Sequence, residues 1–296
     1  MNLATLFSDI VAVMAPVFLI AALGYAWARL KLPYDGAFIT TLMINVATPC
    51  LVFSTLLRLR FPPAELGTIA AASLACLLLT TMAAFAVLRL RRLPLRVYLP
   101  ALIFPNSGNM GMPLCLFAFG ETGLGLAVVF FAVLAVAQFT LGPAIAAGRL
   151  DPWQMLRTPL VHAVALALLL QALGQQLPRW AANTTTLLGD CAVPLMLLSL
   201  GVALARLRTA GMGRAVAMAA VRLGLGFAAG LLVAEAMGLE GTMRGVVMLE
   251  SAMPVAVFNY LWAVRYDTAP EEVAGMVLAS TVLSFVPLPL LLLVVM

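Results

Sequence analysis

A stretch of 24 residues, Val97 to Gly120, contains no charged side chain but is interrupted by residues that break helices. Its centre reads Phe104-Pro-Asn-Ser-Gly-Asn-Met-Gly-Met-Pro113. A continuous helix in lipid cannot hold these residues, because freed backbone N–H and C=O groups would go unpaired at a cost on the order of several kcal/mol each. The segment must therefore line a site walled by protein, as the broken helices of secondary transporters do. A second such segment is Glu250-Ser-Ala-Met-Pro254.

The whole chain is 64% hydrophobic and only 10% charged, whereas soluble domains carry about 25% charged residues. Ten apolar stretches have the length of roughly 20 residues that one bilayer crossing needs. They are residues 9–30, 36–57, 66–88, 97–119, 122–147, 158–177, 181–205, 213–236, 242–264 and 273–296. These features predict an all-α polytopic membrane protein whose surroundings are the lipid bilayer, and nothing in the sequence suggests a nucleic acid partner.

Lys and Arg are distributed unequally between alternate loops. The loops after the first, third, fifth, seventh and ninth predicted helices carry 12 of these residues, against 4 on the other side. Basic loops remain on the cytoplasmic side of a membrane. The asymmetry therefore predicts a protein of the cytoplasmic (inner) membrane with both termini extracytoplasmic.

The two halves of the chain match at a constant offset of 145 residues. Asn45 aligns with Asp190, Pro49 with Pro194 and Ser54 with Ser199. Because each half contains five predicted helices, the second half must enter the membrane upside down relative to the first. The pattern predicts two inverted five-helix repeats, a construction common among transporters.

Four motifs carry a resemblance to a known family: Asn45-Val-Ala-Thr-Pro-Cys-Leu51, Asn106-Ser-Gly-Asn-Met-Gly-Met-Pro-Leu114, Val193-Pro-Leu-Met-Leu-Leu-Ser-Leu-Gly201 and Ser251-Ala-Met-Pro254. Together they resemble the bacterial branch of the auxin efflux carrier (AEC) family, and the similarity spans essentially the whole chain. The resemblance implies a fold related to that of bile-acid sodium symporters, with ten helices of which the fourth and ninth are broken and cross.

The resemblance also implies a division of the chain. Residues 1–147 form the first five-helix repeat, 148–157 a short cytoplasmic linker and 158–296 the second repeat. Helices one, two, six and seven would form a scaffold, and helices three to five and eight to ten a mobile transport domain. Pro113 and Pro254 would be the prolines at the crossing. A homodimer through the scaffold helices is a further option.

Polar and flexible residues around the two breaks are the candidate substrate-binding residues: Asn45, Asn106, Ser107, Asn109, Met110, Ser251 and Pro254. The simpler alternative is that the asparagines and the serine only satisfy the broken backbone. Half-helix N-termini carry positive partial charge and free N–H groups. A carboxylate could therefore bind at the breaks without a nearby Lys or Arg.

Glu250 and Asp190 are the acidic residues most clearly within predicted spans, where an ionised carboxylate is costly and a functional role is the default expectation. Glu250 is the candidate proton carrier or Na⁺ ligand, so H⁺ or Na⁺ is the expected coupling ion. Asp190 is a second candidate, or alternatively caps a helix before Pro194. Arg222 either pairs with one of these carboxylates or contacts an anion. No other cofactor and no metal is predicted.

An enzyme is not expected, because the sequence contains one histidine and lacks nucleophile and metal-ligand motifs such as Gly-x-Ser-x-Gly and His-Glu-x-x-His. The sequence instead predicts a secondary active transporter of a small organic anion that works by an elevator-type alternating-access mechanism, and the resemblance implies that the anion is a carboxylate or auxin-like acid. A passive anion channel or uniporter is the alternative, since broken helices also build channel filters.

Overall fold

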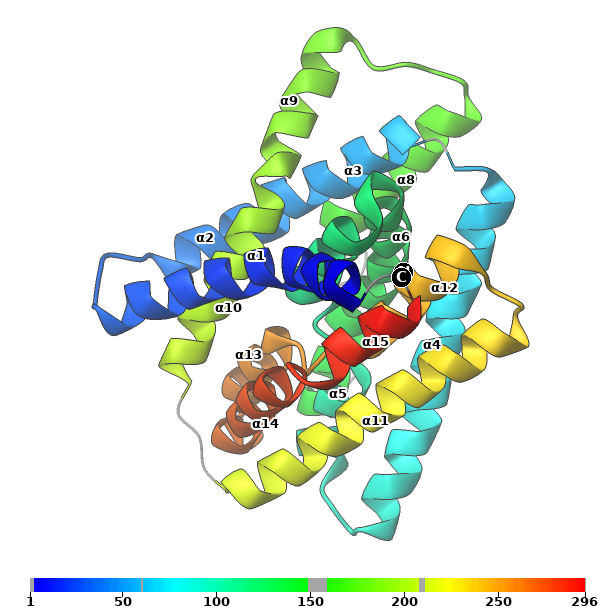
Figure 1. The fold of residues 1–296 in the computed structure, drawn as a ribbon. Coiled ribbons are helices and arrows are strands. Elements are labelled where there is room, and N and C mark those ends of the chain that lie inside the picture. The colour runs from blue at the N-terminus through cyan, green and yellow to red at the C-terminus, as the bar shows by residue number, and fades with distance from the viewer. Residues whose placement is uncertain (1–2, 60, 149–158, 208–210, 296) are drawn as a thin grey trace.

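The computed structural model describes residues 3–59, 61–148, 159–207 and 211–295, and these residues are helical almost throughout (Figure 1). Within this part of the chain the sole pairing of sheet type is an isolated antiparallel bridge between Pro105 and Val255. Six helices are each long and apolar enough to cross a membrane, or seven if one pair bent by 52° is counted as a single span. The predicted class, an all-α polytopic membrane protein, agrees with these helices.

The first half begins with long helices and then becomes irregular. Its elements are α1 (Leu3–Arg29), α2 (Gly36–Leu42), the π-helical turn η1 (Met43–Ala47), α3 (Thr48–Leu59), α4 (Pro63–Leu90), α5 (Leu95–Ile103), the π-helical turn η2 (Ser107–Gly111) and α6 (Met112–Ala147). The segments α2, η1 and α3 form one continuous rod of 24 residues. Gly120, with φ 64° and ψ −155°, bends α6 sharply. Only glycine adopts this conformation readily. The bend lies between the predicted fourth span, 97–119, and the predicted fifth span, 122–147.

The second half is also built of helices. Its elements are α8 (Pro159–Ala172), α9 (Arg179–Asp190), α10 (Ala192–Arg206), α11 (Met212–Ala236), α12 (Gly241–Ser251), α13 (Val257–Tyr266), α14 (Pro270–Leu283) and α15 (Pro287–Val295). The helix α8 has 14 residues and is shorter than the predicted span 158–177. Apart from Gly148, the predicted linker 148–157 lies outside the described residues.

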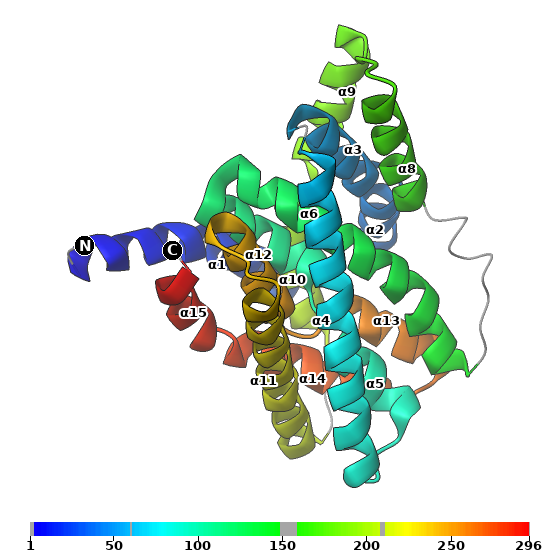
Figure 2. The same ribbon diagram turned by 90° about the vertical axis from the view of Figure 1, so that its right-hand side faces the viewer.

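The helices pack in two groups. In one group α1 lies along α10, and α3 packs against both α8 and α9. In the other, α4, α5, α6, α11 and α12 pack on one another, and α14 packs on α11 and α13. The α8–α9 hairpin projects from the rest, and the start of α1 lies near the end of α15 (Figure 2).

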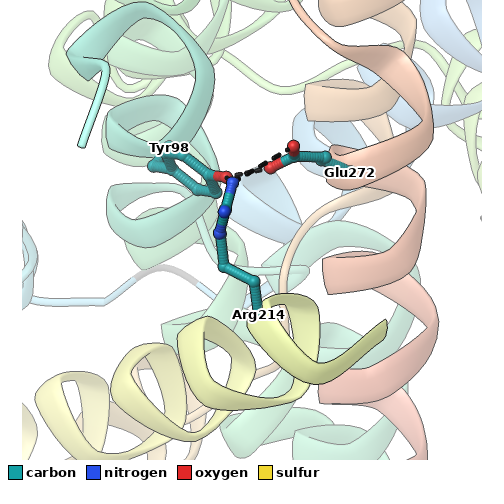
Figure 3. A network of polar contacts seen from close by, with 3 residues as sticks. All are labelled: Tyr98, Arg214 and Glu272. Carbon is teal, nitrogen blue, oxygen red and sulfur yellow. Dashed lines mark hydrogen bonds and ion pairs between the residues drawn. The ribbon is translucent and has the colours of Figure 1, made fainter. Parts of the chain in front are cut away.

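A polar cluster joins the N-terminal ends of three helices in the second group (Figure 3). The Tyr98 hydroxyl on α5 donates a hydrogen bond to Glu272 on α14. Arg214 on α11 lies 3.4 Å from both the Glu272 carboxylate and the Tyr98 hydroxyl. Tyr98 is buried. The cluster therefore fixes α5, α11 and α14 relative to one another at one end of the molecule.

Candidate functional site

Two extended segments cross at the centre of the second group of helices. Pro105 and Val255 form the antiparallel bridge. On either side of it the Asn106 N–H donates to the Pro254 carbonyl at 2.7 Å, and the Ala256 N–H donates to the Phe104 carbonyl at 3.2 Å. The half-helices α5 and α12 end at the crossing, and η2 and α13 begin there. Paired backbone groups thus replace the helical hydrogen bonds lost at the two breaks.

The predicted position of one crossing proline is wrong. Pro254 does lie at the crossing, but Pro113 is in the first turn of α6, and Pro105 occupies the corresponding place in the first break. The π-turn η2 directly precedes Pro113, and the Met112 N–H there reaches back to the Ser107 carbonyl. A wider turn at the start of α6 accommodates a residue without an N–H, so Pro113 does not break the helix.

Arg222 on α11 is buried at the C-terminal ends of the two half-helices. Its guanidinium donates to the carbonyls of Leu102 at 2.8 Å, Ser251 at 2.6 Å and Met253 at 3.3 Å. C-terminal carbonyls carry negative partial charge and lack partners within their own helix. Arg222 therefore does not pair with Glu250 or Asp190 as one of its two predicted roles required, since its hydrogen bonds go to backbone carbonyls.

A cavity of about 690 Å³, the main cavity, lies between the two groups of helices. The α2–η1 rod and α10 form one wall, and the crossing, α6 and α13 form the other. Its polar lining residues are Tyr34, Thr40, Thr41, Thr48, Asn106, Asn109, Gln138, Ser199 and Arg206. Aromatic and sulfur-containing residues make up much of the rest: Met43, Phe131, Phe139, Met196, Phe258 and Tyr260. Such a mixture suits a small ligand with an apolar body and few polar groups.

The electrostatic character of the main cavity is positive. Arg206 is the one charged side chain among the described lining residues, and it lies 5.3 Å above the ring of Tyr34. The N-terminal turns of η2 and α13 also face the cavity, through Asn106 and Gly108 and through Ala256 and Val257. Their first N–H groups have no partner within the helix and carry positive partial charge. The cavity can therefore receive an anion.

Two of the predicted substrate-binding residues line the main cavity. Asn106 is 4% exposed, and its side-chain amide nitrogen has no hydrogen-bond partner within the described part of the chain. Asn109 lies one turn further along and is partly buried. Gln138 on α6 adds a second buried amide nitrogen without a partner among the described residues. An oxygen atom of a ligand could accept from both amides.

Glu250 lies behind η2 and does not line the main cavity. Its side chain is fully buried and packs so closely against Gly111 that a Cβ there would collide with the carboxyl group. The Cys115 thiol lies 3.7 Å from one carboxyl oxygen, and the other oxygen has no partner among the described residues. The Ser107 hydroxyl lies beside the carboxyl but is not aligned for a hydrogen bond. A proton or a small cation would satisfy this group.

The other predicted residues near the breaks have structural surroundings. Met110 is packed in the apolar core. The Ser251 hydroxyl donates to the Val247 carbonyl of its own helix at 2.7 Å. Pro254 contributes its carbonyl to the crossing. These residues and Ser107 therefore shape the site from behind the cavity wall.

Asn45 and Asp190 lie away from the main cavity. Asn45 is exposed on η1, and Asp190 is exposed at the end of α9. Their position within apolar stretches predicted burial, but a position along a helix does not determine which face the side chain occupies. Asp190 is therefore not placed to act with Glu250.

Sequence reasoning missed the cavity wall formed by Tyr34, Ser199 and Arg206. The Tyr34 and Ser199 hydroxyls lie 2.9 Å apart, and an Arg206 nitrogen lies 3.4 Å from the Tyr34 carbonyl. Tyr34 and Arg206 lie between predicted spans, where polar residues are common and do not indicate a binding site. The available signal was Ser199, which lies in the motif Val193 to Gly201 and is the repeat counterpart of Ser54.

Comparison with known proteins gives consistent matches. The model of a family described as membrane transport protein matches residues 9–154 and 143–292. An uncharacterised transporter of Methanothermobacter thermautotrophicus is 27% identical over 289 residues, 93% of this chain and 94% of the relative. Another uncharacterised transporter, from Methanocaldococcus jannaschii, is 24% identical over 62% of this chain and 63% of its own. Auxin efflux carrier component 1 of Arabidopsis thaliana is 27% identical over 39% of this chain and 19% of its own.

Proposed function

Because this chain belongs to the membrane transport protein family, to which the auxin efflux carriers also belong, we propose that it is a secondary active transporter of a small organic anion. The main cavity is the observation that carries the proposal. It combines two half-helix N-termini, the amides of Asn106 and Gln138 and the cation Arg206. A carboxylate or an auxin-like acid fits this arrangement, since the N–H groups and Arg206 bind its charge while the aromatic residues contact its body.

The helices are consistent with ten spans in two inverted repeats. In this interpretation α5 with η2 and the start of α6 forms the fourth span, and α12 with α13 forms the ninth. The group containing α1, α3, α8 and α10 is the scaffold, and the group containing the crossing is the transport domain. A cavity at the boundary between the groups supports an elevator-type movement of one against the other.

The orientation follows from the basic loops. The main cavity is bordered by the α1–α2 connection and the end of α10, which lie on the side with more Lys and Arg. We infer that this side is cytoplasmic. The structure then represents a state in which the substrate site is open to the cytoplasm of a cell with an inner membrane.

Glu250 is our candidate for energy coupling. A fully buried carboxyl group with one oxygen lacking a partner among the described residues would be stabilised either by a proton or by Na⁺. The group lies directly behind the N-terminal turn that faces the substrate cavity. Loading of Glu250 could therefore alter the position of η2 and so affect anion binding.

The proposal is tested by transport into proteoliposomes that contain the purified protein. Radiolabelled malonate, malate and indole-3-acetate are supplied with and without a Na⁺ gradient and a pH gradient. We expect saturable uptake of at least one of them, accelerated by unlabelled substrate on the opposite side. Failure of all three acids to bind or enter would contradict the organic-anion assignment.

A passive anion channel or uniporter is the alternative. A channel would give flux that does not show acceleration by substrate on the opposite side, whereas a uniporter would show it but would not concentrate the anion. Accumulation against the anion gradient, driven by H⁺ or Na⁺, would exclude both. The same proteoliposome experiment therefore distinguishes the three possibilities.

A further inference from the structure

A second cavity, of about 700 Å³, lies at the other end of the α2–η1–α3 rod from the main cavity. It is bounded by α3, α8, α9 and the first turn of α4. Its polar lining residues are Ser54, Arg58, Gln171, Gln175, Gln176, Thr185 and Thr186. The arginine is the one charged residue among its described lining residues.

The two cavities are related by the internal repeat. Many residues that line the main cavity have a partner 145 positions away that lines the second cavity. Four pairs are identical: Ala37 and Ala182, Thr40 and Thr185, Thr41 and Thr186, and Ser199 and Ser54. Three pairs differ: Val202 and Leu57, Ala203 and Arg58, and Arg206 and Phe61. Two threonines and one serine therefore lie at equivalent positions in both cavities, whereas the arginine of each cavity occupies a position of its own.

The cavities differ in what faces that surface. The crossing and α13 face it in the main cavity but do not line the second cavity. At the second cavity Arg58 on α3 forms an ion pair with Glu121 on α6, beside the bend at Gly120. Leu59 and Phe61 pack against Gly125, one turn further along α6. At this end an acidic residue of the second group of helices thus pairs with the arginine.

We propose that the second cavity is the anion vestibule of the opposite membrane face, and that Arg58 is its anion-binding residue, occupied by Glu121 in the present state. The inference rests on the proposed function and adds a binding residue on the other side of the membrane. Both partners of the ion pair are about half exposed, with side-chain exposures of 50% and 55%. Exposed ion pairs are weak, so movement of α6 can separate them, and the released guanidinium can then bind a carboxylate through two parallel hydrogen bonds.

Two single variants separate anion binding by Arg58 from a simple structural ion pair. Both Arg58→Gln and Glu121→Gln break the pair. If Arg58 binds the anion, Arg58→Gln raises the KM measured from the side of the second cavity by about tenfold, as expected for loss of one charge-assisted contact. Glu121→Gln leaves Arg58 free, so that KM stays the same or falls.

The assay is initial uptake of radiolabelled malonate or indole-3-acetate, whichever the wild type takes up, into proteoliposomes sorted by orientation. KM is measured separately from each side. Arg58→Lys retains the positive charge without the two parallel hydrogen bonds, so its KM should lie between those of the wild type and Arg58→Gln, and it tests the proposal even if Arg58→Gln folds poorly. Arg91→Gln, an exposed arginine outside both cavities, is the matched control and should leave both KM values unchanged.

The outcomes distinguish this inference from the proposed function. A raised KM from the second side in Arg58→Gln, together with an unchanged or lowered KM in Glu121→Gln, supports the vestibule. Similar effects of the two variants, or an unchanged KM in Arg58→Gln while the wild type transports the anion, would overturn the role of Arg58 and leave the proposed function intact. Absence of transport of every acid by the wild type would overturn both.

Discussion

Three carbonyl groups converge on the Arg222 guanidinium, and two of them belong to the last turns of α5 and α12. A buried cation is costly unless its donors are satisfied, and here each of its nitrogen atoms has a backbone acceptor. The positive charge also offsets the negative ends of two half-helices. One side chain thus stabilises both breaks, on the side of the crossing away from the helix N-termini that face the main cavity.

Replacement of Arg222 by Met should destabilise the protein by on the order of 3 kcal/mol, because three buried carbonyls lose their donors. Thermal unfolding of the purified protein in detergent measures the change as a lower midpoint. Arg222→Lys should be intermediate, since an ammonium retains the charge without the planar arrangement of donors. Arg214→Gln, which removes the partly exposed ion pair with Glu272 but leaves the Tyr98–Glu272 hydrogen bond in place, is the control and should cost less than about 1 kcal/mol. Equal midpoints for Arg222→Met and Arg214→Gln would contradict the capping role.

Glu250→Gln tests coupling at the same scale. If Glu250 carries the proton, the neutral amide resembles the protonated carboxyl, so uptake driven by a pH gradient should be lost while exchange of substrate between the two sides continues. Uptake and exchange are compared in the same proteoliposomes. Asp190→Asn is the matched control and should have no effect, because Asp190 is exposed at the end of α9. Wild-type rate and pH dependence in Glu250→Gln would remove Glu250 from the mechanism, and a strict Na⁺ requirement would replace proton carriage with ion ligation.

Among the elements, the two breaks depend on prolines that end α5 and α12. Pro105 and Pro254 lie in the extended segments, where a residue with an N–H could instead continue the helix. Pro105→Ala or Pro254→Ala should therefore favour continuous helices, remove free N–H groups from the main cavity and reduce uptake by about tenfold or more, while insertion into the membrane stays normal. Membrane-fraction yield and initial uptake rate measure the two effects.

Pro113→Ala is the control for those two variants. Pro113 lies in the first turn of α6, where its missing N–H costs little, so its replacement should change uptake less than either crossing variant. A larger loss in Pro113→Ala than in Pro105→Ala would show that the crossing at Pro105 does not control the site.

The sequence predicted that both helices are broken, but not which residues pair at the breaks. Uncharged stretches with Pro, Gly and Asn must be protected from lipid wherever they occur, and this requirement depends on composition alone. The choice between Pro105 and Pro113 depends on pairing with Val255, about 150 positions away, and on a π-turn that no local pattern marked. The missed residues Tyr34 and Arg206 illustrate the same limit, because a cavity wall is formed by packing between distant helices.

For the whole molecule, the internal offset of 145 residues has a consequence beyond the motifs that revealed it. It relates the linings of two cavities at opposite ends of the α2–η1–α3 rod, although the helices that face those linings differ. In an inverted repeat each half can take up the conformation of the other half. A surface used at one membrane face is then available at the other. The role of each cavity therefore depends on which side of the membrane it faces.

The basic-loop asymmetry predicts that the α13–α14 connection lies in the cytoplasm and the α8–α9 connection outside. After replacement of Cys50, Cys76, Cys115 and Cys191 by Ala, single cysteines at Asp267 and Gln175 report the two connections, since both residues are exposed. In sealed right-side-out vesicles a membrane-impermeant maleimide should label Gln175→Cys and not Asp267→Cys, and inside-out vesicles should give the reverse. Because Gln175 also lines the second cavity, the same result would assign that cavity to the extracytoplasmic face. The opposite labelling pattern would invert the orientation and place the main cavity on the outside.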